Sequence, residues 1–215
     1  MNASWKKQLD EHRGKRKEEI IDAAEALFME QELTRVTMKD IVERCGFSRV
    51  TLYKYFKSID EIIFEVQIRI LLRFKADLEE TVHSASSGFL KFRAMFDHLL
   101  ENFEENRNRN RFIGMFDFNF RDSYPTPELE QRYRSFLHSG KGPFAEWLEE
   151  GQQDGSIRQD ISVDVCTAMI SNVMNATMHR IAIRGDILHQ DQRVDPALVL
   201  REMTTMILAY LQPNR

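Results

Sequence analysis

One stretch of the sequence, from Thr37 to Lys57, restricts the fold more than any other. It reads TMKDIVERCGFSRVTLYKYFK and predicts two short helices joined by a tight turn. A threonine followed three residues later by Asp40 is a helix-capping signal, so we expect the first helix over residues 38–44. Gly46 can adopt the positive φ angle that such a turn requires. Two short helices joined by a glycine-containing turn are typical of a helix-turn-helix.

The second helix of this motif is expected to present basic groups to the solvent. Ser48 offers a hydroxyl as its N-cap, and Leu52 and Phe56 lie four residues apart on its inward face. From Arg44 to Lys57 there are four basic residues and no acidic one, although the whole chain carries a net charge of −4. Basic groups neutralise phosphates, and a helix in the major groove reads base edges. A solvated surface helix would explain the basic run alone, but the turn and caps favour DNA binding.

The pattern extends over further positions: Thr37, Ile41-Val42, Gly46, Ser48-Arg49-Val50-Thr51-Leu52-Tyr53-Lys54-Tyr55-Phe56 and Lys57-Ser58-Ile59-Asp60-Glu61-Ile62. In these positions the stretch resembles the helix-turn-helix of the TetR family of transcriptional regulators. Two residues depart from the family pattern. Val50 stands where a small residue is common, which bears on the base that is read, and Ile59 replaces a usual lysine. The resemblance implies an all-α fold with a DNA-binding head and a ligand-binding, dimerising body.

The resemblance and the charge pattern together assign roles within the motif. Arg49 and Thr51 are expected to read bases, and Tyr53 to make apolar contact with a base or sugar, with Val50 beside them on the same helix. Phosphate contacts are expected from Thr37, Ser48, Lys54, Tyr55 and Lys57. The core of the head is expected to contain Ile41, Val42, Cys45, Leu52 and Phe56.

The residues around the motif predict its supports and a domain boundary. An apolar stripe indicates a bracing helix over about 15–31, whereas residues 1–13 have no helical periodicity and are expected to form a frayed arm. Ser58 and Glu61 form a capping box that starts a long helix, and the pattern breaks at 84–88. We expect a DNA-binding domain over 14–74, with its helix-turn-helix at 37–56. A ligand-binding and dimerisation domain is expected over 75–215.

The second domain is also predicted to be helical. Residues 89–106 are expected to form one amphipathic helix, and the arginine-rich run 107–111 is interpreted as a solvated connector. The alternating Phe116, Phe118 and Phe120 are compatible with a strand, but their spacing with nearby apolar residues favours a helix. Thr126-Pro127 starts another helix, which breaks at 140–143.

Two helices, at about 163–184 and 196–212, end the chain. Both are too apolar for helices with one face in water, so they lie in the core or meet a partner. The family resemblance implies a homodimer formed through these last two helices.

The sequence shows no signature of catalysis, metal binding or membrane insertion. It lacks a nucleophile-plus-base motif, a phosphate loop, a dinucleotide fingerprint and zinc-spaced ligands. We therefore expect no enzyme activity, catalytic residue, metal or cofactor. Two distant cysteines, Cys45 and Cys166, favour reduced thiols and a cytoplasmic location, with a redox pair as the alternative. His179 is interpreted as a satisfied histidine rather than a ligand contact. No apolar stretch is long enough to cross a bilayer, and no signal peptide is expected.

Two classes of function follow. The favoured one is a ligand-responsive repressor that binds double-stranded operator DNA as a homodimer and is released by a small-molecule inducer. The inducer, its pocket residues and the operator are not named by the sequence, and an activator is compatible with the same motif. The alternative is a small-molecule-binding helical protein or enzyme without DNA binding.

Overall fold

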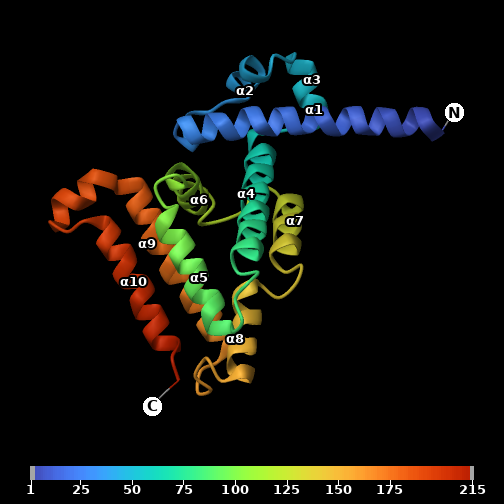
Figure 1. Cartoon of the computed structure of the whole chain (residues 1–215). Helices are drawn as coiled ribbons and strands as arrows, with labels where there is room; N and C mark the ends of the chain where they lie inside the picture. Colours follow the sequence, from blue (N-terminus) through green and yellow to red (C-terminus); the bar gives the residue numbers. More distant parts are fainter. Residues whose placement is uncertain (1–2, 214–215) are drawn as a thin grey trace. The chain divides into compact units, whose positions relative to one another are not determined.

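The computed structural model describes residues 3–213, with side chains from Glu11 onward. Every α-helix or 3-10 helix below lies in that range, which contains no strand, so the predicted all-α fold is confirmed (Figure 1). In chain order the elements are α1 (Ala3–Glu30), η1 (Leu33–Arg35), α2 (Met38–Cys45), α3 (Arg49–Tyr55), α4 (Ile59–Thr81), α5 (Gly88–Glu101), α6 (Arg107–Asn119), α7 (Pro127–Leu137), α8 (Pro143–Asp154), α9 (Val163–Gln192) and α10 (Pro196–Leu211). None of the described helices has the length and apolarity needed to cross a membrane.

The chain divides into two compact units. The first, here called the head unit, comprises the described residues up to Ile70 together with Met115–Phe136. The second, the body unit, comprises Leu71–Gly114 and the described residues from Leu137 onward. The residues at the end of α6 and along α7 therefore pack with the helix-turn-helix. The functional division into 14–74 and 75–215 stays a prediction.

The helix-turn-helix begins and turns where the sequence predicts. The Thr37 backbone N–H donates to Asp40 Oδ2 at 2.8 Å, and the Thr37 hydroxyl accepts from the Asp40 N–H, which completes a capping box. Gly46 ends α2 with φ 71°, in the left-handed region that a residue with a Cβ atom rarely adopts. The turn thus depends on a glycine at this position.

Apolar side chains of α1 hold α2 and α3 in place. Ile20, Ala24 and Phe28 of α1 are buried, and α1 packs against α2, which contacts α3 (Figure 1). From the motif, Ile41, Leu52 and Phe56 are buried, whereas Val42 and Cys45 are half-buried. Burial of one large aliphatic or aromatic side chain contributes about 1.5–3 kcal/mol, so this small core accounts for the fixed angle of α3.

The first helix corrects one expectation. Residues 3–14 continue α1 by more than three turns, whereas the sequence pattern predicts a frayed arm over 1–13. The segment lacks an apolar stripe, but lysine, glutamine and glutamate have a high intrinsic preference for helix. Residues 1 and 2 of the predicted arm lie outside the described residues.

In the body unit, α5 packs against α8 and α10, and α9 packs against α8 and α10 (Figure 1). A close approach of α5 to α8 depends on Gly88, because a Cβ atom there would lie 2.2 Å from the Trp147 carbonyl oxygen. Buried aromatic side chains fill this contact, with the rings of Phe92 and Trp147 5.4 Å apart edge to face.

Two further differences concern α6 and α9. The run 107–111 forms the first turn and a half of α6 instead of a connector. The helix predicted for the alternating phenylalanines is confirmed, because α6 extends to Asn119. A predicted helix end at Arg184 is instead a kink: Gly185 has φ 45° and ψ −126°, and α9 resumes as far as Gln192. The kink admits Arg107, whose Nη2 would lie 2.2 Å from a Cβ atom on Gly185.

Candidate nucleic-acid interface

Helix α3 presents an unusual mixture of apolar and basic side chains to the solvent. Val50 is 69% exposed and Tyr53 is 53% exposed, whereas Leu52 on the opposite side is completely buried. Arg49 and Lys54, which flank this pair, are also exposed. A valine and a tyrosine left in water beside two cations form a surface suited to base edges and phosphates.

The N-terminus of α3 is fixed by Ser48. Its Oγ accepts from the Thr51 backbone N–H at 3.1 Å and lies 2.9 Å from Thr51 Oγ1. Thr51 is half-buried, and the bond between the two hydroxyls holds its side chain at the start of the helix. Arg49 and Val50 are the first two residues after this cap, so the cap fixes the direction in which their exposed side chains point.

All nine residues predicted to contact DNA lie in the stretch from Thr37 to Lys57. Seven are exposed and two, Thr51 and Tyr55, are half-buried; the exposed ones are Thr37, Ser48, Arg49, Val50, Tyr53, Lys54 and Lys57. Their individual roles as base or phosphate contacts stay predictions.

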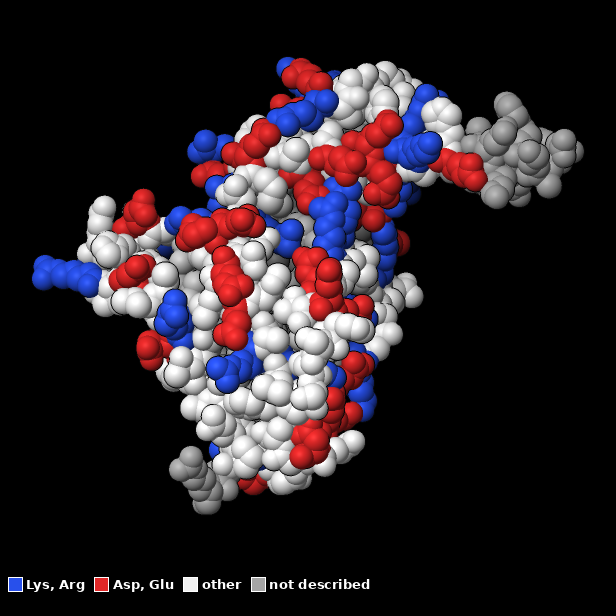
Figure 2. Space-filling model, viewed as in Figure 1, with Lys and Arg blue, Asp and Glu red and all other residues white. Residues whose placement is uncertain are grey.

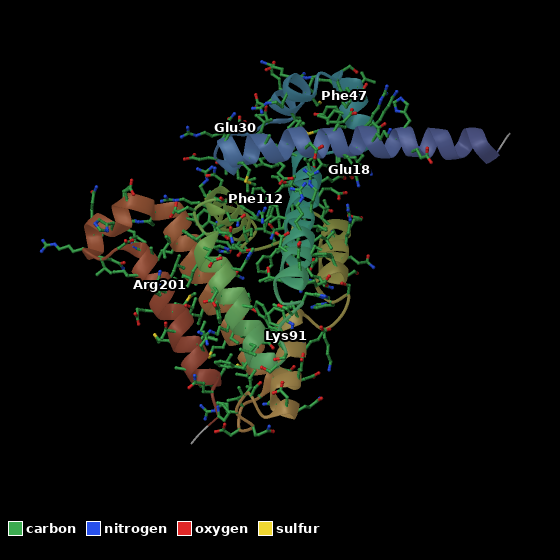
Figure 3. All side chains as sticks on the ribbon, viewed as in Figure 1. Glu18, Glu30, Phe47, Lys91, Phe112 and Arg201 are labelled. Carbon is green, nitrogen blue, oxygen red and sulfur yellow. The ribbon has the colours of Figure 1, made fainter. Side chains whose placement is uncertain are left out.

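One of the four basic residues in the motif is engaged elsewhere. Arg44 forms a bidentate pair with Glu30 at the end of α1, with Arg44 Nη1 donating to Glu30 Oε1 at 3.1 Å. This hydrogen bond lowers the pKa of the Glu30 carboxyl, although burial opposes the shift. In the turn between α2 and α3, the Phe47 ring lies 5.9 Å from the Arg16 guanidinium carbon (Figure 3). The pair with Glu30 secures α2 to α1 through Arg44, so Arg49, Lys54 and Lys57 are left as candidate DNA contacts.

A groove of about 680 Å³ lies beside the C-terminal end of α3. Residues 53–57 form one wall, and the start of α4 forms another. The third wall comes from the segment preceding α7 and from α7 itself, and contains Thr126, Glu128 and Arg132. Sequence reasoning did not connect α7 with the motif, because it lies about seventy residues further along the chain.

The carboxylates of this groove are held by neighbouring donors. Glu65 Oε1 lies 2.6 Å from Lys17 Nζ and 2.7 Å from Arg132 Nη2. The pKa of Glu128 is lowered, first by a hydrogen bond to its own backbone and then by Thr126, with the charge of Lys57 adding to the effect. Lys57, a predicted phosphate contact, therefore has an acidic neighbour on α7.

The basic residues of the motif are not part of a uniformly basic surface. Figure 2 shows Lys and Arg side chains intermixed with Asp and Glu on the face in view. Attraction to DNA therefore depends on the few cations at and around α3 rather than on the charge of the whole molecule. Among the described residues, no group of three histidine, cysteine or acidic side chains could hold a metal ion.

Residues 20–66 match the family model described as bacterial regulatory proteins, tetR family. Over 150 residues the chain is 24% identical to the transcriptional repressor KstR2 of Mycolicibacterium smegmatis, covering 70% of this chain and 71% of KstR2. Residues 20–66 are a DNA-binding region of the TetR type.

Two more proteins resemble the chain, one in sequence and one in structure. The uncharacterised regulator YfiR of Bacillus subtilis is 46% identical over 52 residues, which are 24% of this chain and only 25% of YfiR. The crystal structure of the regulator FadR from Bacillus subtilis, in complex with stearoyl-CoA, has a TM-score of 0.65 at 20% identity. That alignment covers 90% of this chain and 98% of FadR, and it shows the shared fold.

Proposed function

We propose that this chain is a sequence-specific DNA-binding transcriptional repressor of the TetR family that leaves its operator when a small molecule binds. The observation that carries this proposal is the exposed face of α3, where Val50 and Tyr53 stand in solvent between Arg49 and Lys54. The repressor KstR2 and the acyl-CoA-bound FadR support both halves of the proposal, DNA binding and ligand binding.

Within this proposal, α3 lies in the major groove. Arg49 and Thr51 contact base edges, with Val50 and Tyr53 contributing apolar contacts. Phosphates are bound by the N-cap residues of α2 and α3 and by the C-terminal end of α3 with its flank, namely Thr37, Ser48, Lys54, Tyr55 and Lys57. The DNA-binding domain then corresponds to residues 14–74, and the remainder, 75–215, binds the effector and dimerises.

The last two helices carry the proposed dimer interface. Val165 on α9 is 69% exposed and Met206 on α10 is 70% exposed. Further large apolar side chains on or between the same helices are also exposed: Val173, Ile183, Ile187, Val194, Leu198 and Tyr210. Such a concentration of exposed apolar groups is a mark of a protein–protein interface. A homodimer places two recognition helices in successive major grooves, roughly 34–36 Å apart, on a near-palindromic operator. Because its partner is DNA, we assign the protein to the cytoplasm.

Fluorescence anisotropy with labelled DNA from the region upstream of the protein's own gene tests the proposal. We expect submicromolar binding that weakens steeply between about 50 and 200 mM salt, and that unlabelled random DNA competes for poorly. The variant R49A should lose the preference for the cognate DNA while keeping its fold. If the wild-type chain bound cognate and random DNA equally, the repressor would be excluded in favour of a ligand-binding protein or enzyme that does not read DNA.

A further inference from the structure

A buried carboxamide in the head unit has one end without a partner. Gln67 of α4 is only 2% exposed, and its Nε2 lies 3.3 Å from the phenol oxygen of Tyr133 on α7. Its Oε1 is buried and has no hydrogen-bond partner among the described residues. Rotating the carboxamide by 180° exchanges its two ends, but one end still faces the phenol and the other still lacks a partner. Burying such a group costs free energy that a ligand can recover.

Aromatic rings surround this polar pair. The ring of Phe64, one turn before Gln67 on α4, lies 5.0 Å from Phe116, 4.9 Å from Phe120 and 5.4 Å from Tyr133. Tyr124 is a fourth neighbour at 6.0 Å. A mainly apolar and aromatic lining with a few polar groups is the usual composition of a small-molecule site.

The polar pair itself is uncharged. Burial raises the pKa of Tyr133 to about 12, although the bond from Gln67 opposes the shift and the charge of Asp117 adds to it. The phenol is therefore protonated at neutral pH and can both donate and accept a hydrogen bond. Two cations lie nearby on α7, but Arg132 binds Glu65, and Arg134 binds Glu130 and lies over the ring of Tyr124.

We propose that Gln67, held by Tyr133, anchors the effector, and that the effector places an uncharged ring-bearing portion among these rings, with one hydroxyl or carbonyl oxygen at the unpartnered end of the carboxamide. This inference rests on the proposed function, since it names the ligand chemistry of a ligand-released repressor. It extends the effector site from residues 75–215 into the first half of α4, where Phe64 and Gln67 lie. The half-buried ring of Tyr124, on the non-helical segment between α6 and α7, is the part of the cluster that the ligand displaces.

The position of Gln67 connects this site with the DNA-binding helices. Glu65 and Arg69, each two residues from Gln67 on α4, both bond to α1: Glu65 to Lys17, and Arg69 to Asp22 at 2.5 Å. A ligand that pushes on Gln67 therefore acts on the same two turns of α4 that hold α1 and, through α1, the angle of α3. Binding of the ligand shifts the population among orientations of the DNA-binding helices only to the extent that the ligand binds one orientation more tightly than another.

The test compares 2-naphthol with naphthalene, which has the same rings but no hydroxyl. We expect isothermal titration of the wild-type protein to show about tenfold tighter binding of 2-naphthol, equivalent to one good hydrogen bond in a buried site. In Q67L this preference should fall below about twofold while naphthalene binding is kept, and Y133F should reduce the preference in the same direction. The control Q131L alters an exposed glutamine on the same helix, α7, and should behave as wild type.

Three results would overturn the proposal: equal affinity of the wild type for both compounds, no binding of either, or an unchanged preference in Q67L. An unchanged preference would mean that the free end of the carboxamide holds a bound water only. Thermal unfolding monitored by circular dichroism identifies any variant that does not fold. If Q67L does not fold, the preference for 2-naphthol is tested with Y133F, which keeps the ring. The ligand titrations contain no DNA. If the wild type does not bind its operator, the anisotropy experiment shows this, and the result of the ligand titrations is unaffected.

Discussion

Glu65 Oε1 lies 2.6 Å from Lys17 Nζ, and the same oxygen lies 2.7 Å from Arg132 Nη2. One carboxylate oxygen thus joins α1, α4 and α7, three helices that come from distant parts of the sequence. The Glu65 side chain is only 11% exposed, whereas those of Lys17 and Arg132 are 39% and 50% exposed, so solvent screens these pairs partly, less than it screens fully exposed ion pairs. The contact fixes α1, which braces the recognition helix, to the helix that leads out of the motif.

We predict that E65Q lowers the free energy of unfolding by about 1–3 kcal/mol at pH 7, because two charge-assisted hydrogen bonds are weakened. Burial opposes ionisation of Glu65, but the bonds from Lys17 and Arg132 outweigh it and lower its pKa below the ordinary value of 4.5. The stabilisation is therefore complete above pH 4.5 and is lost as the pH falls through the lower folded-state pKa. Urea unfolding of both proteins from pH 7 to pH 3 should show their difference shrinking below pH 4.5.

The matched control for this variant is E149Q. Glu149 pairs with Lys141 at 2.6 Å, but both side chains are well exposed, so removing its charge should change stability very little. If E65Q and E149Q lowered the unfolding free energy equally at pH 7, the three-helix contact would have no special role.

Local signals predicted the helix-turn-helix well, because its boundaries depend on neighbouring residues. Thr37 with Asp40, Gly46 and Ser48 each form the cap or turn that their residue types favour. The long fourth helix is a partial case: the Ser58 hydroxyl accepts from Glu61 N–H as predicted, but Glu61 accepts from the backbone of Lys57 instead of Ser58. Which of these two backbone N–H groups Glu61 accepts from depends on one rotation of its side chain.

Features that depend on distant contacts were not predictable from local patterns. The packing of α7 on the head unit rests on Arg132 and Tyr133, whose partners Glu65 and Gln67 lie more than sixty residues earlier. The kink at Gly185 is similar, because an isolated glycine in an apolar pattern indicates a helix end as readily as a kink. The role of Gln67 as a buried polar residue had no sequence signal, since glutamine suits an exposed helix position equally well.

The residues of α3 and its flank should separate into base readers and phosphate binders. We predict that R49A weakens binding to the cognate site by about 1–3 kcal/mol and weakens binding to random DNA far less. K57A should weaken both by a similar factor and reduce the slope of log affinity against log salt by about one unit. Anisotropy titrations at several salt concentrations measure both quantities, and identical behaviour of the two variants would contradict the assignment.

Val50 should contribute to specificity without contributing to stability. The side chain is 69% exposed, so V50A should change the free energy of unfolding by less than about 0.5 kcal/mol. If the valine covers a thymine methyl group, V50A should weaken binding to the cognate site by about 1–2 kcal/mol, because less apolar surface is then buried against that methyl group. A panel of operators with single base changes should show reduced discrimination at one position only; a uniform reduction would assign Val50 to general packing on the DNA.

Glu128 should weaken the contact of Lys57 with phosphate. Its carboxylate is ionised more readily than usual, partly because of the Lys57 charge, and it repels an approaching phosphate. We predict that E128Q binds DNA more tightly than wild type, with a larger gain at about 50 mM than at about 200 mM salt, because surface interactions are screened. Anisotropy titrations of E128Q and of the double variant E128Q/K57A measure the effect. The gain should disappear in the double variant, and its persistence there would place the action of Glu128 elsewhere.

The exposed apolar face of α9 and α10 should be required for dimerisation. Met206 lies near the middle of α10 and is 70% exposed, whereas its neighbour Ile207 is buried in the body unit. We predict that M206E dissociates the dimer at micromolar concentration, because a glutamate desolvated in the interface without a partner is costly. The monomer should keep its fold, since the substituted side chain faces solvent within each chain. Sedimentation velocity measures the change in mass, and circular dichroism checks the helix content.

The operator affinity of M206E should fall as the dimer dissociates, because one recognition helix then binds a single half-site. The control E202Q changes an exposed residue one turn earlier and should leave the dimer intact, whereas a fully dimeric M206E would exclude this face.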